Sequence, residues 1–507
     1  MRAVGNTANG SQQVERIDCM KKYLALLLTC LLAVPFTGCK KGDNVLPPPQ
    51  DTGDSAETDF ADRFHPDDCK GYEFTLLTRN CCVSHVAGFW ADVDSKSDAV
   101  SNAVFSRTSA VESKLGCFLS YDTVADGYPE KLVVAENGNM KICDVALIHA
   151  QYIGAVALSG NLLDMGKIKS IEWERPWWNR VVIEANSIDG HFFAARGVID
   201  VNSLTELSCL YFNKNILASE FSAETDLFRT VSDGKWTFER MGEMARQVGR
   251  DMNTDGKMTL EDDQFGFVTE PGYMNIWQYA LGAMTTVRNE NGIPVLCGYS
   301  ERLQLIVDGM RSLIWGGNGN WCETNATTAK TLERTLFMMG QLSDVVNDED
   351  FRRLQNVYGI LPLPKYAESE RYVSHAVGHS DQIGIPRSAR EDLEKVTQIL
   401  EALVYFGYEI IRPAVYEEAL QYRYVSDPYS GGAMLDIILD SVTSDFAEFA
   451  AASDQSLLHK QTYLMDKLTG TDNSIGLKGY LKTLDGEGGA SSVLAKYVEQ
   501  FRQYAED

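Results

Sequence analysis

The sequence predicts an α/β protein built on mostly parallel sheets. Strand-like segments alternate with helix-like segments, and the strands are nearly continuous apolar runs such as KICDVALI and LSCLYF. Parallel strands need crossover connections, usually helices, which cover both faces of a sheet and leave the strands buried. We expect strands at residues 72–78, 117–121, 141–148 and 207–212, and helices at residues 98–115 and 127–137.

Polar residues follow the apolar strand predicted at residues 141–148. In open α/β sheets, ligands bind outside the carboxyl ends of the strands. We therefore place His149, Gln151 and Tyr152 at a ligand-binding edge. The alternative for each of them is an ordinary residue of a surface loop.

Two tryptophans and one acidic residue extend this candidate site. Trp277, Trp315 and Asp381 fall near the expected ends of strands. Aromatic rings suit the C–H faces of sugars, and carboxylates accept hydrogen bonds from hydroxyls. The set contains no cluster of Arg or Lys, which an anion would favour. We expect a neutral carbohydrate stacked on Trp277 and bonded to Asp381; the alternative for Trp277 is a core residue.

Three further tryptophans lie within the segment WERPWWNR. Trp173, Trp177 and Trp178 could stack on sugar rings or pack a junction between lobes. The sequence leaves both alternatives open.

An acidic loop at residues 251–262 has the spacing of a calcium site. It follows a predicted amphipathic helix that starts after Thr237 and ends near Gly249. Side-chain oxygens recur at alternate positions, a glycine allows a sharp turn, and the twelfth position is Asp instead of the usual Glu. The alternative is an Asx-turn with solvated carboxylates. A structural Ca²⁺ ion is expected on Asp251, Asn253, Asp255, the Lys257 carbonyl and Asp262.

The N-terminal region predicts a bacterial lipoprotein. Residues 20–38 form a signal peptide with a basic start and an apolar run too short to span a bilayer. Gly38-Cys39 resembles a lipobox, which would place the lipid on Cys39. Residues 1–19 are interpreted as lying upstream of the true start at Met20, and residues 39–70 as a disordered tether. The alternative is an ordinary cleaved signal peptide.

Composition and motifs limit the classes of function. The formal net charge of −25 disfavours nucleic acid as a partner. The eleven cysteines show no metal-binding spacing. The sequence has no zinc-protease, phosphate-loop or dinucleotide-binding motif, so we expect no enzyme. Carboxylates are nevertheless plentiful enough for a glycosidase-type acid pair.

Several segments together resemble a known family. After the lipobox and the acidic tether come ERPWWNR, LYFNKNIL, DGKWTFERM, DMNTDGKMTLEDDQFGF, GILPLPKY, IGIPRSA, ILEAL and AMLDIIL. In this order they resemble the extracellular solute-binding lipoproteins of ABC transporters, family 1 of the carbohydrate type. The resemblance covers roughly residues 70–450.

The resemblance implies a two-lobed periplasmic-binding-protein fold of type II, whose lobes close on a ligand. It implies that Asp144 ends the third strand near the ligand. The expected partners are a sugar and ABC permease subunits, outside the cytoplasm, with a lipid anchor. A secreted glycan hydrolase and a sensor or adhesion lipoprotein remain alternatives. The first lobe is expected at residues 71–190 and 365–420, and the second at 191–364 and 421–507.

Overall fold

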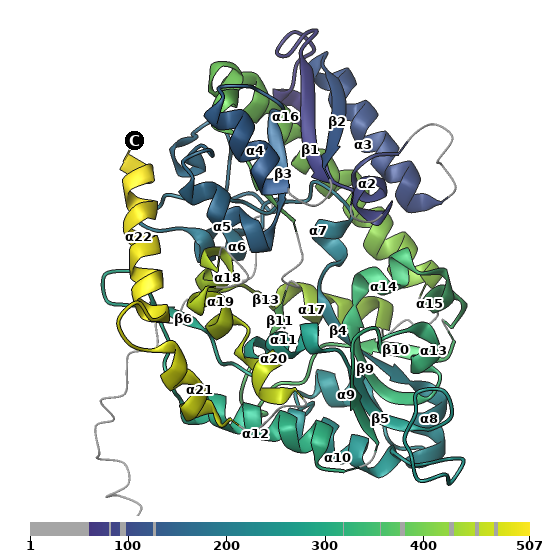
Figure 1. The fold of residues 1–507 in the computed structure, drawn as a ribbon. Helices are drawn as coiled ribbons and strands as arrows, with labels where there is room; N and C mark the ends of the chain where they lie inside the picture. Colours follow the sequence, from purple (N-terminus) through teal and green to yellow (C-terminus); the bar gives the residue numbers. More distant parts are fainter. Residues whose placement is uncertain are drawn as a thin grey trace, which may run out of the picture. The chain divides into compact units, whose positions relative to one another are not determined.

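The computed structural model describes residues 60–506, apart from 81–82, 92–97, 125–127, 318, 355, 376–380, 425–429, 452–455 and 471–474. From Asp59 onward the chain forms one compact unit. The predicted signal peptide, Cys39 and most of the predicted tether lie outside the described residues. The unit contains two main sheets with helices around them (Figure 1). We call the parts built on them the first and second lobes.

The first sheet is mostly parallel, as predicted. Its four strands have the order β12-β3-β1-β2. β1 is parallel to β2 and β3, whereas β12 is antiparallel to β3. The strands are β1 (Glu73–Arg79), β2 (Phe118–Val124), β3 (Val145–His149) and β12 (Asp381–Gly384).

The second sheet is mixed, because its inner strand β4 is antiparallel to both of its neighbours. The order is β10-β4-β9-β5-β8. β5 is parallel to β8 and β9, and β4 is antiparallel to β9 and β10. The strands are β4 (Ser208–Asn213), β5 (Phe265–Thr269), β8 (Asn320–Cys322), β9 (Thr335–Gln341) and β10 (Tyr358–Leu361).

Side chains of the first sheet alternate between two apolar clusters, one on each face. Leu76 and Leu147 pack with α3 and α16, whereas Leu77 and Ile148 pack with α5, α18 and α22. Burial on both faces explains why β3 is an unbroken apolar run. These helices are α3 (Ala99–Leu115), α5 (Ala150–Leu158), α16 (Leu393–Phe406), α18 (Phe446–Ala450) and α22 (Ala490–Glu506).

The second sheet is covered in the same way. Leu210 and Phe337 pack with one group of helices, and Tyr211 and Met338 pack with another. The first group is α10 (Phe238–Val248), α11 (Met274–Ala280), α12 (Glu301–Trp315) and α20 (Leu464–Thr469). The second is α14 (Leu342–Asn347), the π-helical segment η7 (Ala414–Tyr424) and α17 (Leu435–Asp440).

The remaining elements are short. They are η1 (Phe60–Arg63), α2 (Val83–Phe89), α4 (Tyr128–Asn137), η3 (Met165–Lys167), α6 (Arg180–Asn186), α7 (Asn202–Thr205), α8 (Lys214–Glu220), α9 (Leu227–Ser232), η4 (Pro271–Tyr273), β6 (Thr286–Arg288), β7 (Pro294–Leu296), α13 (Ala329–Leu332), α15 (Glu349–Arg353), β11 (Ser374–His375), η5 (Arg387–Asp392), η6 (Gly407–Ile411), η8 (Ser430–Met434), β13 (Val442–Thr443), α19 (Leu457–Thr462) and α21 (Leu477–Leu484).

The helix before the acidic loop forms as predicted. Thr237 is the N-cap of α10, and its side chain accepts a hydrogen bond from the Arg240 N–H. Met241, Ala245 and Val248 lie on the buried face of the helix. The strand expected after the loop is β5.

The folded unit begins earlier than predicted. The tether prediction for residues 39–70 is wrong for residues 60–70, because their apolar side chains pack on the first lobe. Ala61, Phe64 and Cys69 are buried in the cluster that contains α3 and α16. The Phe60 ring contacts Trp177, with 4.6 Å between the ring centroids.

The C-terminal region is shared between the lobes. The assignment of residues 421–507 to the second lobe is wrong for α18 and α22, which pack against α5. Phe446 and Phe501 belong to the same apolar cluster as Leu77 and Ile148, so they cover one face of the first sheet. α20, in contrast, packs against α11 and α12 of the second lobe.

The tryptophan-rich segment is part of the first-lobe core. Trp177 and Trp178 are buried, and both indole N–H groups donate to Glu401 Oε1, over 2.7 and 3.4 Å. Burial raises the pKa of the Glu401 carboxyl, and the two indole hydrogen bonds oppose this rise. The packing alternative for this cluster is the one that the structure supports.

Candidate functional site

The first candidate edge is formed where β1 and β3 end and β12 begins. Antiparallel pairing sets Asp381 opposite His149. Arg79 is the last residue of β1, on the other side of β3. Its Nη2 atom lies 2.8 Å from Asp381 Oδ1, and the two side chains are 13% and 8% exposed. The edge therefore carries an ion pair that spans the end of the central strand.

More charged side chains surround this ion pair in the segment that leads into the second lobe. Arg196 and Asp200 are buried, and together with Glu206 and Asp381 they line a cavity of about 10 Å³. That volume is close to the space of one water molecule. Glu206 Oε2 is buried and has no hydrogen-bond partner among the described residues.

Burial sets the protonation of these carboxyls. It raises the pKa of Asp381 to about 7, and the Arg79 charge opposes the rise. It raises the pKa of Glu206 to about 8, with Arg196 opposing the rise and Asp200 adding to it. Near neutral pH the protonated, uncharged forms of Asp381 and Glu206 are therefore substantially populated.

The second candidate edge is formed where β5, β8 and β9 end. These strands are parallel, so the polar residues that follow them come together. Gln341 ends β9, and its Nε2 donates to the Tyr273 hydroxyl over 3.2 Å. Glu270 follows β5, and its Oε1 accepts hydrogen bonds from the N–H and the hydroxyl of Thr327. Trp321, on β8, is partly exposed.

Short elements connect the two edges. α7 packs against α2 of the first lobe and α14 of the second. Ser208, at the start of β4, donates its hydroxyl to the His375 carbonyl over 3.1 Å. His375 Nε2 in turn lies 2.9 Å from Glu448 Oε2 on α18, which packs on the first lobe. The His375 ring is stacked on Tyr279 at 4.5 Å between ring centroids.

The three residues predicted after the third strand lie at the predicted edge. His149 ends β3 and caps α5, and its Nδ1 accepts a hydrogen bond from the Gln151 N–H over 3.0 Å. Gln151 and Tyr152 are in the first turn of α5 and are partly exposed. Their contact with a ligand stays a prediction.

Trp277 lies in the second-lobe core and offers no face to a ligand. Its side chain is 0% exposed, and its ring packs against Phe238 and Phe267 with centroids 5.8 and 5.6 Å apart. The predicted stacking platform is wrong for this residue, because α11 points it between the sheet and α10 and α12. The core alternative holds.

Asp144 and Trp315 also lie away from the two edges. Asp144 precedes β3 instead of ending it, so it is at the amino end of the strand. There it is paired with Lys141 over 2.8 Å and accepts hydrogen bonds from Tyr72 and the Thr75 N–H. Trp315 ends α12, is 42% exposed, and donates its indole N–H to the Thr469 carbonyl.

Sequence reasoning missed Arg79, Gln341, Tyr273, Glu270 and Trp321. A usable signal was present for two of them, since Glu270 and Gln341 directly follow the apolar runs FGFVT and TLFMMG. No local signal identifies Arg79, because its partner Asp381 comes from a distant segment.

The acidic loop forms a turn stabilised by its own backbone. Asp251 accepts hydrogen bonds from the Thr254 and Gly256 N–H groups, and Asn253 Oδ1 accepts one from Asp255. Asp263, next to the predicted ligand Asp262, closes the loop by accepting from the Met252 and Thr259 N–H groups. Among the described residues no three His, Cys, Asp or Glu side chains are grouped to hold a metal ion. The calcium prediction stays a prediction.

Similar solved structures establish the fold. The cyclic α-maltosyl-1,6-maltose binding protein of Arthrobacter globiformis matches with a TM-score of 0.54 and 11% identity, over 84% of this chain and 100% of its own. The GacH receptor of Streptomyces glaucescens GLA.O, described unliganded and with acarbose, matches at 0.50 and 10%, over 86% and 99%. A tagatose-bound solute-binding protein of an ABC transporter from Thermotoga lettingae TMO matches at 0.50 and 12%, over 84% and 100%.

The chain has the fold of these solute-binding proteins. No protein-family model matches the sequence, and no curated protein matches it either. The predicted fold class is confirmed, and at this level of sequence identity the similarity establishes the fold alone.

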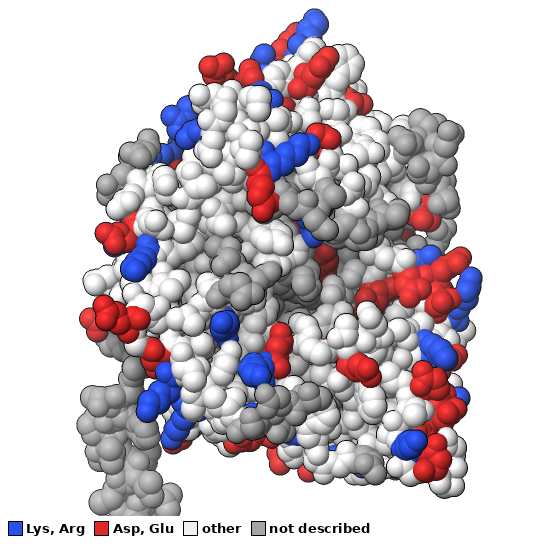
Figure 2. Space-filling model, viewed as in Figure 1, with Lys and Arg blue, Asp and Glu red and all other residues white. Residues whose placement is uncertain are grey.

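Two further features concern the charges on the surface and the length and polarity of the helices. Acidic and basic side chains are interspersed on the described part of the face drawn in Figure 2, without an extended basic area. None of the described helices is both long enough and apolar enough to cross a bilayer.

Glu206 makes the stability of the protein depend on pH. A carboxyl whose pKa is raised on folding stabilises the fold below its unfolded pKa of 4.5, and this contribution is lost as the pH rises through about 8. Glu206→Gln should therefore melt at the same temperature as wild type near pH 4 and higher at pH 9, by about 2 °C or more. Thermal melts across this range measure the difference.

The matched control is Glu290→Gln, at an exposed position between β6 and β7. Its melting temperature should follow wild type at every pH. If the melting temperatures of Glu206→Gln and wild type changed with pH in the same way, the raised pKa of the buried Glu206 carboxyl would be contradicted.

Proposed function

We propose that the protein is an extracytoplasmic solute-binding protein that captures a neutral sugar or oligosaccharide between its lobes and delivers it to an ABC permease. The observation that carries the proposal is the pair of sheet edges with partly exposed polar and aromatic groups, on a fold shared with sugar-binding proteins. The solved structures in question are described with acarbose, tagatose or a cyclic maltose derivative, all of which are carbohydrates.

The chemistry of the two edges supports a neutral polyhydroxy ligand. Gln151, Gln341 and Tyr273 can each donate and accept hydrogen bonds, as sugar hydroxyls do. Tyr152 and Trp321 are partly exposed aromatic rings, which suit sugar C–H faces. Arg79, one of the cations at the first edge, is ion-paired with Asp381.

The binding role is favoured over a hydrolytic one. Two of the buried carboxyls are already engaged by other side chains, Asp381 by Arg79 and Glu401 by two tryptophans. The similar solved structures are described as binding proteins. This supports capture and release of a ligand without its chemical conversion.

Gln151→Ala and Gln341→Ala should each weaken sugar binding tenfold or more, about 1.4 kcal/mol, because a buried ligand hydroxyl would lose its partner. Calorimetric titrations with acarbose, ribitol, tagatose and neutral oligosaccharides measure this. The control is Gln304→Ala, whose amide bonds Asp308 on α12. Tight binding of an amino acid or of inorganic phosphate, with no response to any sugar, would overturn the assignment.

A lipid anchor on Cys39 is the second part of the proposal. It is supported by the basic start, the apolar run and Gly38-Cys39 in the sequence. Mass spectrometry of the mature N-terminus should show a diacylated Cys39. A free amino terminus at another residue would exclude the anchor.

A calcium ion in the loop of residues 251–262 is the third part. It is supported by the spacing of oxygen-bearing side chains and by the left-handed backbone at Thr254 and Gly256, which makes the sharp turn. An ion that binds only the folded state stabilises it by about 2.7 kcal/mol at a hundredfold excess over Kd. A chelator should therefore lower the melting temperature of the calcium-loaded protein.

Asp255→Ala should remove this calcium-dependent difference, whereas Asp440→Ala, an exposed aspartate on α17, should keep it. Identical melting of the loaded wild type with and without chelator would mean that the loop is an Asx-turn only.

A further inference from the structure

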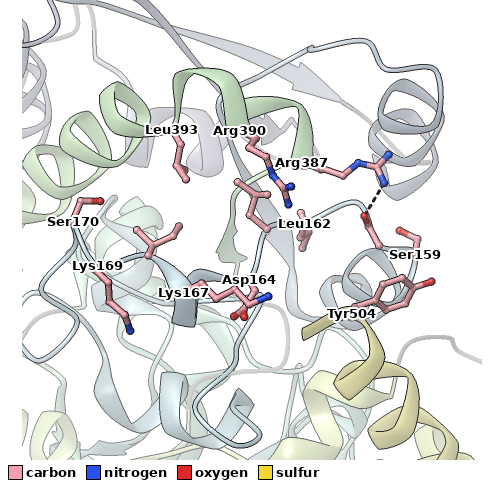
Figure 3. Close-up of a pocket in the computed structure, with 13 residues that line it drawn as sticks. Ser159, Leu162, Asp164, Lys167, Lys169, Ser170, Arg387, Arg390, Leu393 and Tyr504 are labelled. Atoms are coloured by element: carbon pink, nitrogen blue, oxygen red, sulfur yellow. Dashed lines mark hydrogen bonds between the residues drawn. The ribbon is translucent and has the colours of Figure 1, made fainter. Parts of the chain in front are cut away.

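A second cavity lies in the first lobe, apart from the two sheet edges. It has a volume of about 880 Å³, within the range of small-molecule sites. Two segments and one helix enclose it: the chain from Ser159 to Ser170, the start of η5 and α16, and the end of α22 (Figure 3). Neither the sequence analysis nor the proposed sugar site uses these residues.

The walls of the cavity are fixed by backbone contacts. The Leu163 N–H donates to the Ile385 carbonyl over 2.8 Å, and the Arg387 N–H donates to the Asn161 carbonyl over 2.9 Å. Tyr504 of α22 lies against Gly160, where a Cβ atom would be 2.7 Å from the tyrosine ring. These contacts join the two segments, and a side chain of the last helix forms one wall of the cavity.

Positive charge is concentrated around the cavity although the whole chain carries a formal charge of −25. Its lining includes four cations and a single carboxylate. That carboxylate, Asp164, is engaged by the Gly166 and Phe192 N–H groups and by the His191 ring, 2.6 Å away. The cations are Lys167, Lys169, Arg387 and Arg390.

The cations have few partners of their own among the described residues. Lys169 and Arg387 donate only to backbone carbonyls. Lys167 and Arg390 have no side-chain partner in the described part of the chain, and they come from the two facing segments in Figure 3. Two unpaired cations on opposite walls are suited to hold one anionic group between them.

The rest of the lining combines aliphatic side chains with Ser159, Ser170 and Tyr504. Leu393 is partly exposed beside the cations, and Leu162, Leu163 and Ile168 form the floor with 5–7% of their surface exposed. An inorganic anion alone would leave this surface uncovered. A ligand with an anionic group on an apolar body would satisfy both parts of the cavity.

We propose that this cavity is a binding site for an organic phosphate, with the phosphate between Lys167 and Arg390 and an apolar body on Leu162 and Leu393. The same chemistry is presented by a soluble phosphate monoester and by the headgroup of a phosphatidate lipid. The site is independent of the sheet edges, so the protein would bind this ligand with or without a sugar.

Calorimetric titration with octyl phosphate, below its micellar concentration and in a phosphate-free buffer, tests the site. We expect one octyl phosphate per protein, with an affinity that falls as salt is added because the attraction is ionic. Octyl glucoside, the neutral counterpart, should not bind there. Lys167→Ala/Arg390→Ala should weaken octyl phosphate at least tenfold, whereas Lys167→Arg/Arg390→Lys should retain binding.

The matched control is Arg240→Ala/Lys330→Ala, which removes the same charge from exposed positions on α10 and α13. Its affinity for octyl phosphate should equal that of wild type. Melting temperatures and sugar titrations of both double variants should be unchanged, which separates this site from the proposed sugar site. The proposal would be overturned if the two double variants lost affinity for octyl phosphate equally. It would also be overturned if the wild type bound neither octyl phosphate nor phosphatidate vesicles.

Flotation with phosphatidate vesicles, against phosphatidylcholine vesicles, distinguishes the two sources. Octyl phosphate binding that Lys167→Ala/Arg390→Ala weakens at least tenfold, without flotation on either kind of vesicle, supports a soluble monoester. Flotation with phosphatidate alone, lost in the same variant and kept in the control, supports the lipid headgroup.

Discussion

Every strand in the centre of the two sheets is buried on both faces, and this burial determines where polar chemistry can occur. Along β3 and β4, alternate side chains enter two different apolar clusters, so neither face has room for a ligand. Polar groups can reach solvent only where a strand ends. Gln341, the partly exposed last residue of β9, is an example. The location of the candidate site is thus a consequence of how the sheets are covered.

Charge burial is the second constraint on the region between the lobes. Removing Arg79 and Asp381 from water is unfavourable, and their mutual attraction offsets part of that cost. Glu206 has no comparable partner for its Oε2 atom, so it is held closer to the neutral form. The segment that joins the two lobes runs through this group of charges. The protonation state of these side chains therefore affects the stability of that segment.

The tryptophans show how little residue type alone says about a role. Trp277 and Trp177 are both buried, but Trp177 donates its indole N–H to Glu401, whereas the Trp277 indole N–H has no hydrogen-bond partner among the described residues. Trp315 is partly exposed at the end of a helix on the far side of the second-lobe core. Aromatic rings fill cores for the same physical reason that they bind sugars, which is their large apolar surface.

Local features of the chain were determined by the sequence alone. The apolar runs predicted β1, β2, β3 and β4, Thr237 predicted the start of α10, and the strand–helix alternation predicted a fold that the similar structures confirm. Tertiary structure decided what is joined across long distances. β12 adds antiparallel to β3 and thereby brings Asp381 to Arg79, and α22 returns to the first lobe and sets Tyr504 against Gly160. Such pairings depend on which apolar faces remain uncovered after the sheets form, and no local pattern of residues contains that information.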